Sequence, residues 1–254
     1  MKTLIVARYS FVEIVKSNVL INTLFLGLGL VVIIYIASEF TYGVPHRIAL
    51  DFGLGAVSLS SVGMATFFGV GLISKEIENR TVYMVLSKPL SRQAFIVGRI
   101  IGMGGILFIN ISIIGVITTC FFSFLGGEIN TLVITTFLFI FLEAMMALGI
   151  IVFFSLITNN TLSIIFTIFF YIVGHALGET KALSFAVSRP LLQSFLKFIE
   201  FILPNFSKIN LRTYVLYEQS LPDSFLIQAF LYAVFYSFFL FLVSTLIFNR
   251  KNLD

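Results

Sequence analysis

The sequence predicts an all-α integral membrane protein that forms a single transmembrane domain, residues 1–254, with six membrane-spanning helices. Three observations lead to this fold class. Hydrophobic residues make up 59% of the chain, only 11% of its residues are charged, and long uncharged windows recur along it. In an average soluble domain, about a quarter of the residues are charged. A chain this apolar could not cover a water-exposed surface, so we expect the lipid bilayer to surround it.

The uncharged windows place the six spans. A helix needs about 20 residues to cross the hydrocarbon core of a bilayer. The stretch 129–178 is about twice that length and is interrupted by Glu143 and by the polar turn 158–161, so it is expected to hold two helices. Helices are expected because no short alternating strands, typical of a membrane barrel, occur. The predicted spans lie near 19–38, 53–74, 100–124, 131–157, 161–177 and 224–248.

The distribution of basic residues predicts the orientation. Lys2, Arg8 and Lys16 precede the first span, which is too long for a signal-peptide core and has no small-residue cleavage pattern after it. Ten of the 16 Lys and Arg residues lie in segments assigned to the inside, and five of the other six lie in the long segment 178–223, where the positive-inside rule is weak. We therefore expect a multi-pass protein of the cell inner membrane with both termini in the cytoplasm.

Several function classes are disfavoured by what the sequence lacks. The net charge of +4 follows from the basic membrane edges, and no basic stripe with interleaved aromatics suggests a nucleic-acid partner. Cys120 is the one cysteine, so no intrachain disulfide or Cys/His metal cluster is expected. No G-x-x-x-x-G-K-[ST] phosphate-binding motif occurs. We expect a non-catalytic chain that binds no cofactor or metal itself.

The most charged stretch, 75–99, lies between the second and third spans. Pro89 is expected to end one helix and Ser91 to cap the next. Residues 82–86 form a compact apolar cluster beside the charges. An ordinary positive-inside loop explains the charges about as well, but the apolar cluster favours a surface that docks onto a partner.

This stretch resembles the signature of type-2 ATP-binding-cassette (ABC) exporter permeases. The resemblance is carried by a pattern of acids and bases, a Leu-Ser-x-Pro break and a Ser-Arg pair: Lys75, Glu76, Glu78, Arg80, Thr81, Leu86, Ser87, Pro89, Ser91, Arg92, Gly98 and Arg99. It extends over the whole chain, including the six spans and the charged tail 248–254. The element Leu203-Pro204-Asn205-Phe206 points to the subgroup of multi-copper enzyme maturation and gliding-type exporters.

The resemblance implies that the segment between spans two and three is a coupling helix bound by a separate cytoplasmic ABC ATPase, which would carry ATP and Mg²⁺. It implies a second permease copy or a paralogue, most simply a homodimer, and it allows a periplasmic or accessory partner. It also implies an N-terminal interfacial elbow, with Leu4, Ile5, Val12 and Val15 opposite Lys2, Arg8, Glu13 and Lys16. The ATPase-coupling interface would consist of Glu76, Glu78, Arg80, Thr81, Tyr83, Met84, Leu86, Ser87, Pro89 and Arg92.

The long segment before the last span contains a second feature. From Pro190 to Leu203, apolar residues recur at helical spacing while Gln193, Lys197 and Glu200 share the other face, which predicts an amphipathic helix ended by Pro204. This helix either lies on the outer leaflet or re-enters it as a hairpin. A gate or partner contact and a simple interfacial lid are equally compatible with the pattern.

Glu143 is the candidate for a substrate path, since an ionisable group within a span is costly and often functional. We expect it nearer the outer end of the fourth span than its middle, protonated or paired. His46 and His175 are assigned no role, and the glycines at 98, 102 and 105 are expected to let helices pack closely. The alternatives are an ion-gradient-driven secondary transporter and a membrane anchor of a larger complex. The sequence does not indicate the substrate.

Overall fold

The structure is a computed structural model that describes residues 2–39, 44–72, 91–182 and 190–250. Every regular element in these residues is helical, which confirms the predicted fold class. The elements are α1 (Lys2–Lys16), α2 (Val19–Glu39), α3 (Pro45–Gly71), α6 (Arg92–Phe124), α7 (Thr131–Ile157), α8 (Asn160–Ala182), α10 (Pro190–Ile202), the 3-10 helix η1 (Phe206–Ile209), α11 (Arg212–Leu216) and α12 (Phe225–Arg250).

Six helices are long and apolar enough to cross a membrane, in agreement with the six predicted spans. They are contained in α2, α3, α6, α7, α8 and α12. Two of these helices begin before the residues predicted to span the membrane. α3 begins at Pro45, where proline is well suited to the first helical turn. α6 begins at Arg92 because Ser91 caps it, accepting a hydrogen bond from the Ala94 backbone N–H at 3.2 Å, as the sequence predicts.

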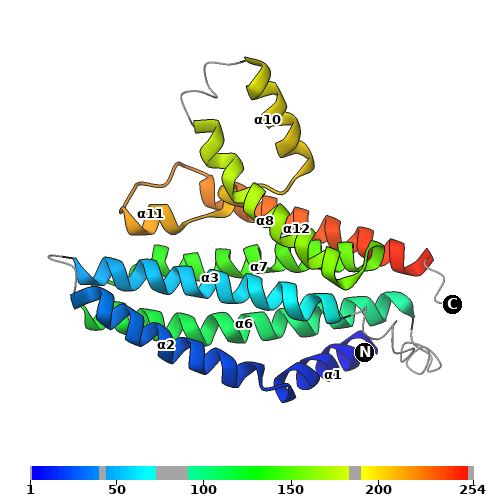
Figure 1. Ribbon diagram of the computed structural model, residues 1–254, viewed down its shortest axis with the longest axis horizontal. Coiled ribbons are helices and arrows are strands. Elements are labelled where there is room, and N and C mark those ends of the chain that lie inside the picture. The colour runs from blue at the N-terminus through cyan, green and yellow to red at the C-terminus, as the bar shows by residue number, and fades with distance from the viewer. Residues whose placement is uncertain (1, 40–43, 73–90, 183–189, 251–254) are drawn as a thin grey trace.

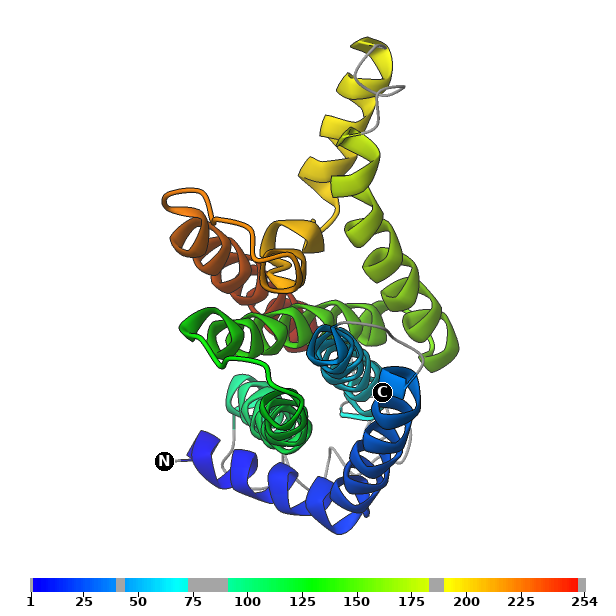
Figure 2. The same cartoon turned by 90° about the vertical axis from the view of Figure 1, so that its left-hand side faces the viewer.

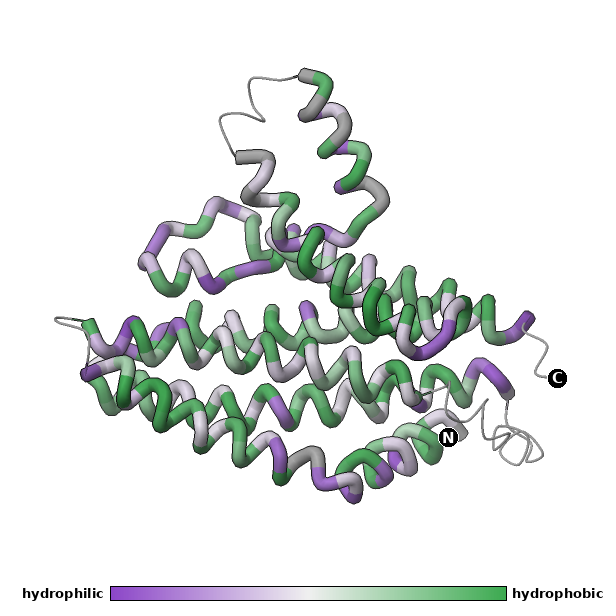
Figure 3. The backbone as a smooth tube through the Cα atoms, in the orientation of Figure 1, coloured by the Kyte–Doolittle hydropathy of each residue, from purple (hydrophilic) through white to green (hydrophobic). Residues whose placement is uncertain are grey.

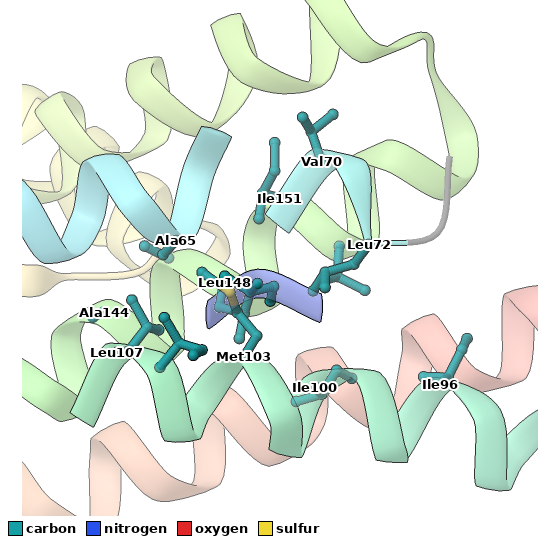
Figure 4. Close-up of a cluster of buried hydrophobic side chains, with 14 of the residues drawn as sticks. Ala65, Val70, Leu72, Ile96, Ile100, Met103, Leu107, Ala144, Leu148 and Ile151 are labelled. Atoms are coloured by element: carbon teal, nitrogen blue, oxygen red, sulfur yellow. The ribbon is translucent and has the colours of Figure 1, made fainter. Parts of the chain in front are cut away.

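The central part of the bundle is built from α3, α6 and α7, which lie side by side in Figure 1. α2 packs along α3 and α6, and α12 packs against α7 and α6. The largest hydrophobic cluster joins α3, α6 and α7, and Figure 4 shows part of it around Met103, Leu107 and Leu148. These three side chains are fully buried. They hold the three helices together away from lipid.

The outer helices present apolar side chains to their surroundings. Within an apolar 18-residue window of α7, 67% of the residues are buried, against 22% in the corresponding windows of α2, α8 and α12. Figure 3 shows that hydrophobic residues cover these helices along most of their length, while many hydrophilic residues gather near helix ends. Exposed large residues such as Phe25, Phe169 and Phe238 are therefore suited to contact lipid or another membrane protein.

α1 packs on α6 through small residues. A Cβ at Gly98 would lie 2.6 Å from the Val6 Cβ, and one at Gly102 would lie 2.7 Å from the Ala7 carbonyl oxygen, so both positions require glycine for this contact. The glycine packing predicted from the sequence is thus confirmed.

The N-terminal helix also has a third face, which packs on the bundle. Its buried face carries Ala7, Ser10 and Ile14, while Leu4 and Ile5 are 67% and 66% exposed. The sequence pattern could not reveal that a glycine stripe on α6, and not lipid, covers one side of α1. Val12 is also exposed, whereas Val15 packs against the core.

α8 and α10 form a helical hairpin that projects from the bundle. Both Figure 1 and Figure 2 show the end of α8 and the whole of α10 extending away from α3 and α6. Leu196 of α10 is buried against Leu177 of α8, whereas Leu191 and Phe198 are exposed. The predicted amphipathic helix is therefore present within one residue of its expected end.

Candidate functional site

Of the residues predicted to form the ATPase-coupling interface, the structure describes only Arg92. Glu76, Glu78, Arg80, Thr81, Tyr83, Met84, Leu86, Ser87 and Pro89 lie outside the described residues. Arg92 is the first residue of α6, and its Nη1 donates a hydrogen bond to the backbone carbonyl oxygen of Asn249 at 3.2 Å. This contact joins the start of α6 to the end of α12.

The same end of the molecule gathers several chain segments. In Figure 1 the start of α1, the end of α3, the start of α6 and the end of α12 all lie at this end. The ring of Phe95 on α6 stacks on that of Phe248 on α12, with centroids 6.1 Å apart, and both side chains are buried. α6, the helix that follows segment 73–90, is therefore tied to the C-terminal helix α12 by an aromatic contact as well as by Arg92.

Arg99 adds an electrostatic tie to α1. Its Nη1 lies 2.6 Å from Oε2 of Glu13, and its guanidinium lies over the ring of Phe95 at 5.6 Å from the centroid. The Arg99 side chain is 7% exposed, whereas that of Glu13 is 54% exposed. Sequence reasoning gave Arg99 no role beyond the motif. The sequence did contain a signal for this role. Arg99 is a single arginine at the start of a long uncharged helix, and a buried arginine needs an acidic partner.

A second polar cluster surrounds Glu143 inside the bundle. The Oε1 atom of Glu143 accepts a hydrogen bond from the Tyr171 hydroxyl at 2.7 Å and lies 2.9 Å from Nε2 of His175. The Ser58 hydroxyl donates to the same carboxylate at 3.3 Å and 3.4 Å. Glu143 is only 7% exposed. Hydrogen bonds from three side chains therefore offset the cost of holding a carboxylate away from water.

The cluster joins three helices at the middle of the bundle. Glu143 is central in α7, which corrects the expectation that it lies toward the end of its span. Tyr171 and His175 are four residues apart and so share one face of α8, while Ser58 comes from α3. The sequence did not predict a role for His175, because a single histidine in an apolar helix does not reveal that an acidic residue lies on a neighbouring helix.

The segment after α10 covers this cluster. The Phe206 ring stacks on His175 with centroids 5.5 Å apart and an interplanar angle of 13°, and it lies 5.1 Å from the Tyr171 ring. Phe206 is fully buried. The element 203–206 that supported the subgroup resemblance thus forms one wall of the Glu143 cluster.

Hydrogen bonds fix this covering segment. The Asn205 backbone N–H donates to the Tyr232 hydroxyl at 2.8 Å, and Glu200 pairs with Lys208 at 3.0 Å. Gly174 on α8 lacks a side chain where Pro204 and Phe206 approach. Contacts to α8, α10 and α12 therefore hold Phe206 in place.

A third polar group lies between α2, α3 and α6. Thr23 donates to the Asn110 side-chain oxygen at 2.9 Å, and the Asn110 amide donates to Ser60 at 3.2 Å and Ser61 at 3.1 Å. Thr23, Ser60 and Asn110 border an open groove of about 200 Å³, which is also lined by Asn22 and by apolar side chains such as Met64 and Phe67. Because Asn110 is hydrogen-bonded through both its oxygen and its nitrogen, we interpret this group as helix packing.

Comparison with protein families decides the class of the protein. Residues 15–253 match the model of the ABC-2 family transporter protein. The chain belongs to the ABC-2 transporter family. The match includes all six spans, so this ABC-2 permease is a multi-pass membrane subunit of an ABC transporter. A search of curated proteins gave no match.

Membership of the ABC-2 family gives the general role of the chain that contains the Arg92 and Glu143 regions. ABC-2 permeases are generally non-catalytic membrane subunits, and the family normally works with a cytoplasmic ATPase. Within the described residues, no group of three or more His, Cys, Asp or Glu side chains could hold a metal ion. Two features of this permease are therefore candidates for a function. One is the start of α6, which is bonded to α12 directly after segment 75–91, and the other is the buried Glu143 cluster.

Proposed function

We propose that this ABC-2 permease is driven by a separate cytoplasmic ABC ATPase that binds the segment between α3 and α6. The observation that carries the proposal is the tie between Arg92 and the C-terminal end of α12, directly after the signature segment. A partner that displaces this segment would act on α6 at its first turn. The apolar residues Tyr83, Met84 and Leu86 and the charged residues Glu76, Glu78 and Arg80 would then contact the ATPase.

The helix ties give such a displacement a route into the membrane domain. α6 has 33 residues and is about 50 Å long at 1.5 Å per residue, which exceeds the hydrocarbon core of about 30 Å. Its start is held to α12 by Arg92 and to α1 by Arg99. Because these three helices share rigid contacts, a movement of the α6 start would shift α1 and the end of α12 with it.

The remaining functional assignments follow from this arrangement. ATP and Mg²⁺ would bind to the partner ATPase, both permease termini would face the cytoplasm, and transport would be export across the inner membrane. A second permease copy or a paralogue would complete the transport path. The hairpin of α8 and α10 would then be on the outer side, where a periplasmic or accessory protein could reach it.

Co-purification with the ATPase tests the proposal. A candidate cytoplasmic ABC ATPase would be co-expressed with the permease, and the amount retained per permease would be measured for the wild type and for the double variant Glu78→Ala, Arg80→Ala. We expect the double variant to retain much less ATPase and to show little transport-linked ATP hydrolysis.

The chain offers a matched control at the opposite end of the bundle. Arg47 and Glu218 form an exposed ion pair at 3.2 Å there. The variant Arg47→Ala, Glu218→Ala removes the same two kinds of charge and should retain the ATPase fully. Equal retention in both double variants would contradict coupling through segment 75–92 and favour a passive membrane anchor.

A further inference from the structure

Arg212 lies at the end of the bundle opposite the termini, beside the Glu143 cluster. It is the first residue of α11, which packs against α3 and α7 and is labelled in Figure 1. Its Nη2 lies 3.9 Å from the position where a Cβ would be at Gly55 of α3. Ser58, a member of the cluster, lies about one turn after Gly55 on the same helix. The guanidinium therefore lies against the helix that supplies Ser58 to the cluster.

The guanidinium of Arg212 has unused donors. Its Nε is buried and has no hydrogen-bond partner. In the described parts of the chain, no ion pair or hydrogen bond is made by this guanidinium. A buried donor without an acceptor costs free energy, and a charged one costs more. Such a group is expected to have an acceptor in the working protein.

The neighbouring acidic groups do not supply that acceptor. On α7, Glu143 already accepts hydrogen bonds from Tyr171 and Ser58 and pairs with His175. On α3, Asp51 lies one turn from Gly55 on the same face, but it is exposed and makes no ion pair with Arg212 in the described structure. In the part of the chain that the structure describes, these acids therefore leave the Arg212 guanidinium without an acceptor.

Arg212 is also held in a fixed position. Leu211 and Val215, on either side of it, are 1% and 7% exposed and are anchored in separate hydrophobic clusters. The Arg212 backbone N–H donates to the Asn210 side-chain oxygen at 3.0 Å. Donors that are fixed before a ligand arrives lose less entropy when it binds.

We propose that Arg212 forms a binding site for an anionic group, a phosphate or a carboxylate, next to the Glu143 cluster. The planar guanidinium presents paired N–H donors that match the oxygens of either group. The ligand is the headgroup of an anionic lipid or a soluble anion, and both provide the same chemistry. The site does not depend on the ATPase, so it can be tested on the permease alone.

Two binding measurements on the purified full-length permease separate the two sources. Native mass spectrometry in detergent would count bound phosphatidylglycerol against phosphatidylcholine. Thermal unfolding would be followed with inorganic phosphate or succinate against chloride at equal ionic strength. Each would be repeated with Arg212→Gln, Arg212→Lys and Arg47→Gln. Arg47 is the control, because it is an exposed arginine at the same end that is already paired with Glu218.

We expect the wild type to prefer the anionic ligand in one of the two measurements. Arg212→Gln should weaken that binding about ten-fold, as expected for the loss of charge-assisted hydrogen bonds. Arg212→Lys should weaken it less, and Arg47→Gln should leave it unchanged. The proposal is overturned if the wild type prefers no anion in either measurement, or if Arg212→Gln binds as well as Arg47→Gln. Circular dichroism of each variant would show that it is folded.

Discussion

Arg99 and Glu13 lie 2.6 Å apart and join α6 to α1 next to the first turn of α6. The arginine side is nearly dry, with 7% of its side chain exposed, while the glutamate is half exposed. The pair therefore differs from a surface salt bridge, because removing the acid would leave the buried Arg99 charge without its acidic partner.

Glu13→Gln should lower the free energy of unfolding by about 1 kcal/mol, a figure that allows for solvent screening of the half-exposed acid. Thermal unfolding of the detergent-solubilised permease would measure the change. Glu39→Gln, at the exposed end of α2, is the control and should have no effect. Equal stabilities of the two variants would mean that the Arg99–Glu13 pair does not hold α1.

Gly98→Ala should destabilise the contact between α1 and α6. The added Cβ would lie 2.6 Å from the Val6 Cβ and 2.9 Å from the Thr3 carbonyl oxygen, so α1 would have to move. Overpacking of this kind costs about 1–3 kcal/mol. The free energy of unfolding in a mild detergent would report the loss.

The same substitution at another glycine provides the control. At Gly29 of α2, no atom lies within 4 Å of the added Cβ. Alanine favours the helix over glycine by about 1 kcal/mol, so Gly29→Ala should be neutral or stabilising. A destabilisation of similar size at both positions would contradict the close approach of α1 and α6.

Glu143→Ala should destabilise the junction of α3, α7 and α8. It would leave the buried Tyr171 hydroxyl without its shortest hydrogen bond and His175 without its acidic partner, at a cost of about 2–3 kcal/mol. Glu143→Gln keeps an oxygen acceptor and should cost less. Unfolding of both variants would be compared with Glu128→Ala, which changes an exposed acid. If Glu143→Ala were as stable as Glu128→Ala, the cluster would not hold the helices together.

Phe206→Ala should uncover His175. The aromatic ring is fully buried against His175 and Tyr171, and its removal should cost about 3–5 kcal/mol. The rate at which diethyl pyrocarbonate modifies His175, followed by mass spectrometry, should rise. Phe235→Ala removes a ring that is 68% exposed and should leave that rate unchanged. A constant rate in both variants would show that Phe206 does not cover the histidine.

The sequence was sufficient for the features that depend on local patterns. Uncharged windows predicted all six spans, Ser91 predicted the cap of α6, and the apolar spacing after Pro190 predicted α10. These features follow from hydrophobicity, capping and periodicity, each of which is read within a few turns of chain.

The polar sites could not be predicted in the same way, because their members come from distant parts of the chain. Glu143 was found as an intramembrane acid, but its partners Ser58 and His175 lie 85 and 32 residues away. Arg99 finds its acid 86 residues away. Which helices become neighbours is decided by packing of the whole bundle, so the pairing of these charges appears only in three dimensions.

The hairpin of α8 and α10 restricts how neighbouring molecules can approach. Because the end of α8 and the whole of α10 extend away from α3 and α6, the hairpin occupies space beyond the other five spanning helices. Two copies related by a twofold axis along the membrane normal must either interlock their hairpins or turn them to the periphery. A single protruding element thereby reduces the geometries of assembly to two families, which disulfide crosslinking from the tip of α10 would tell apart.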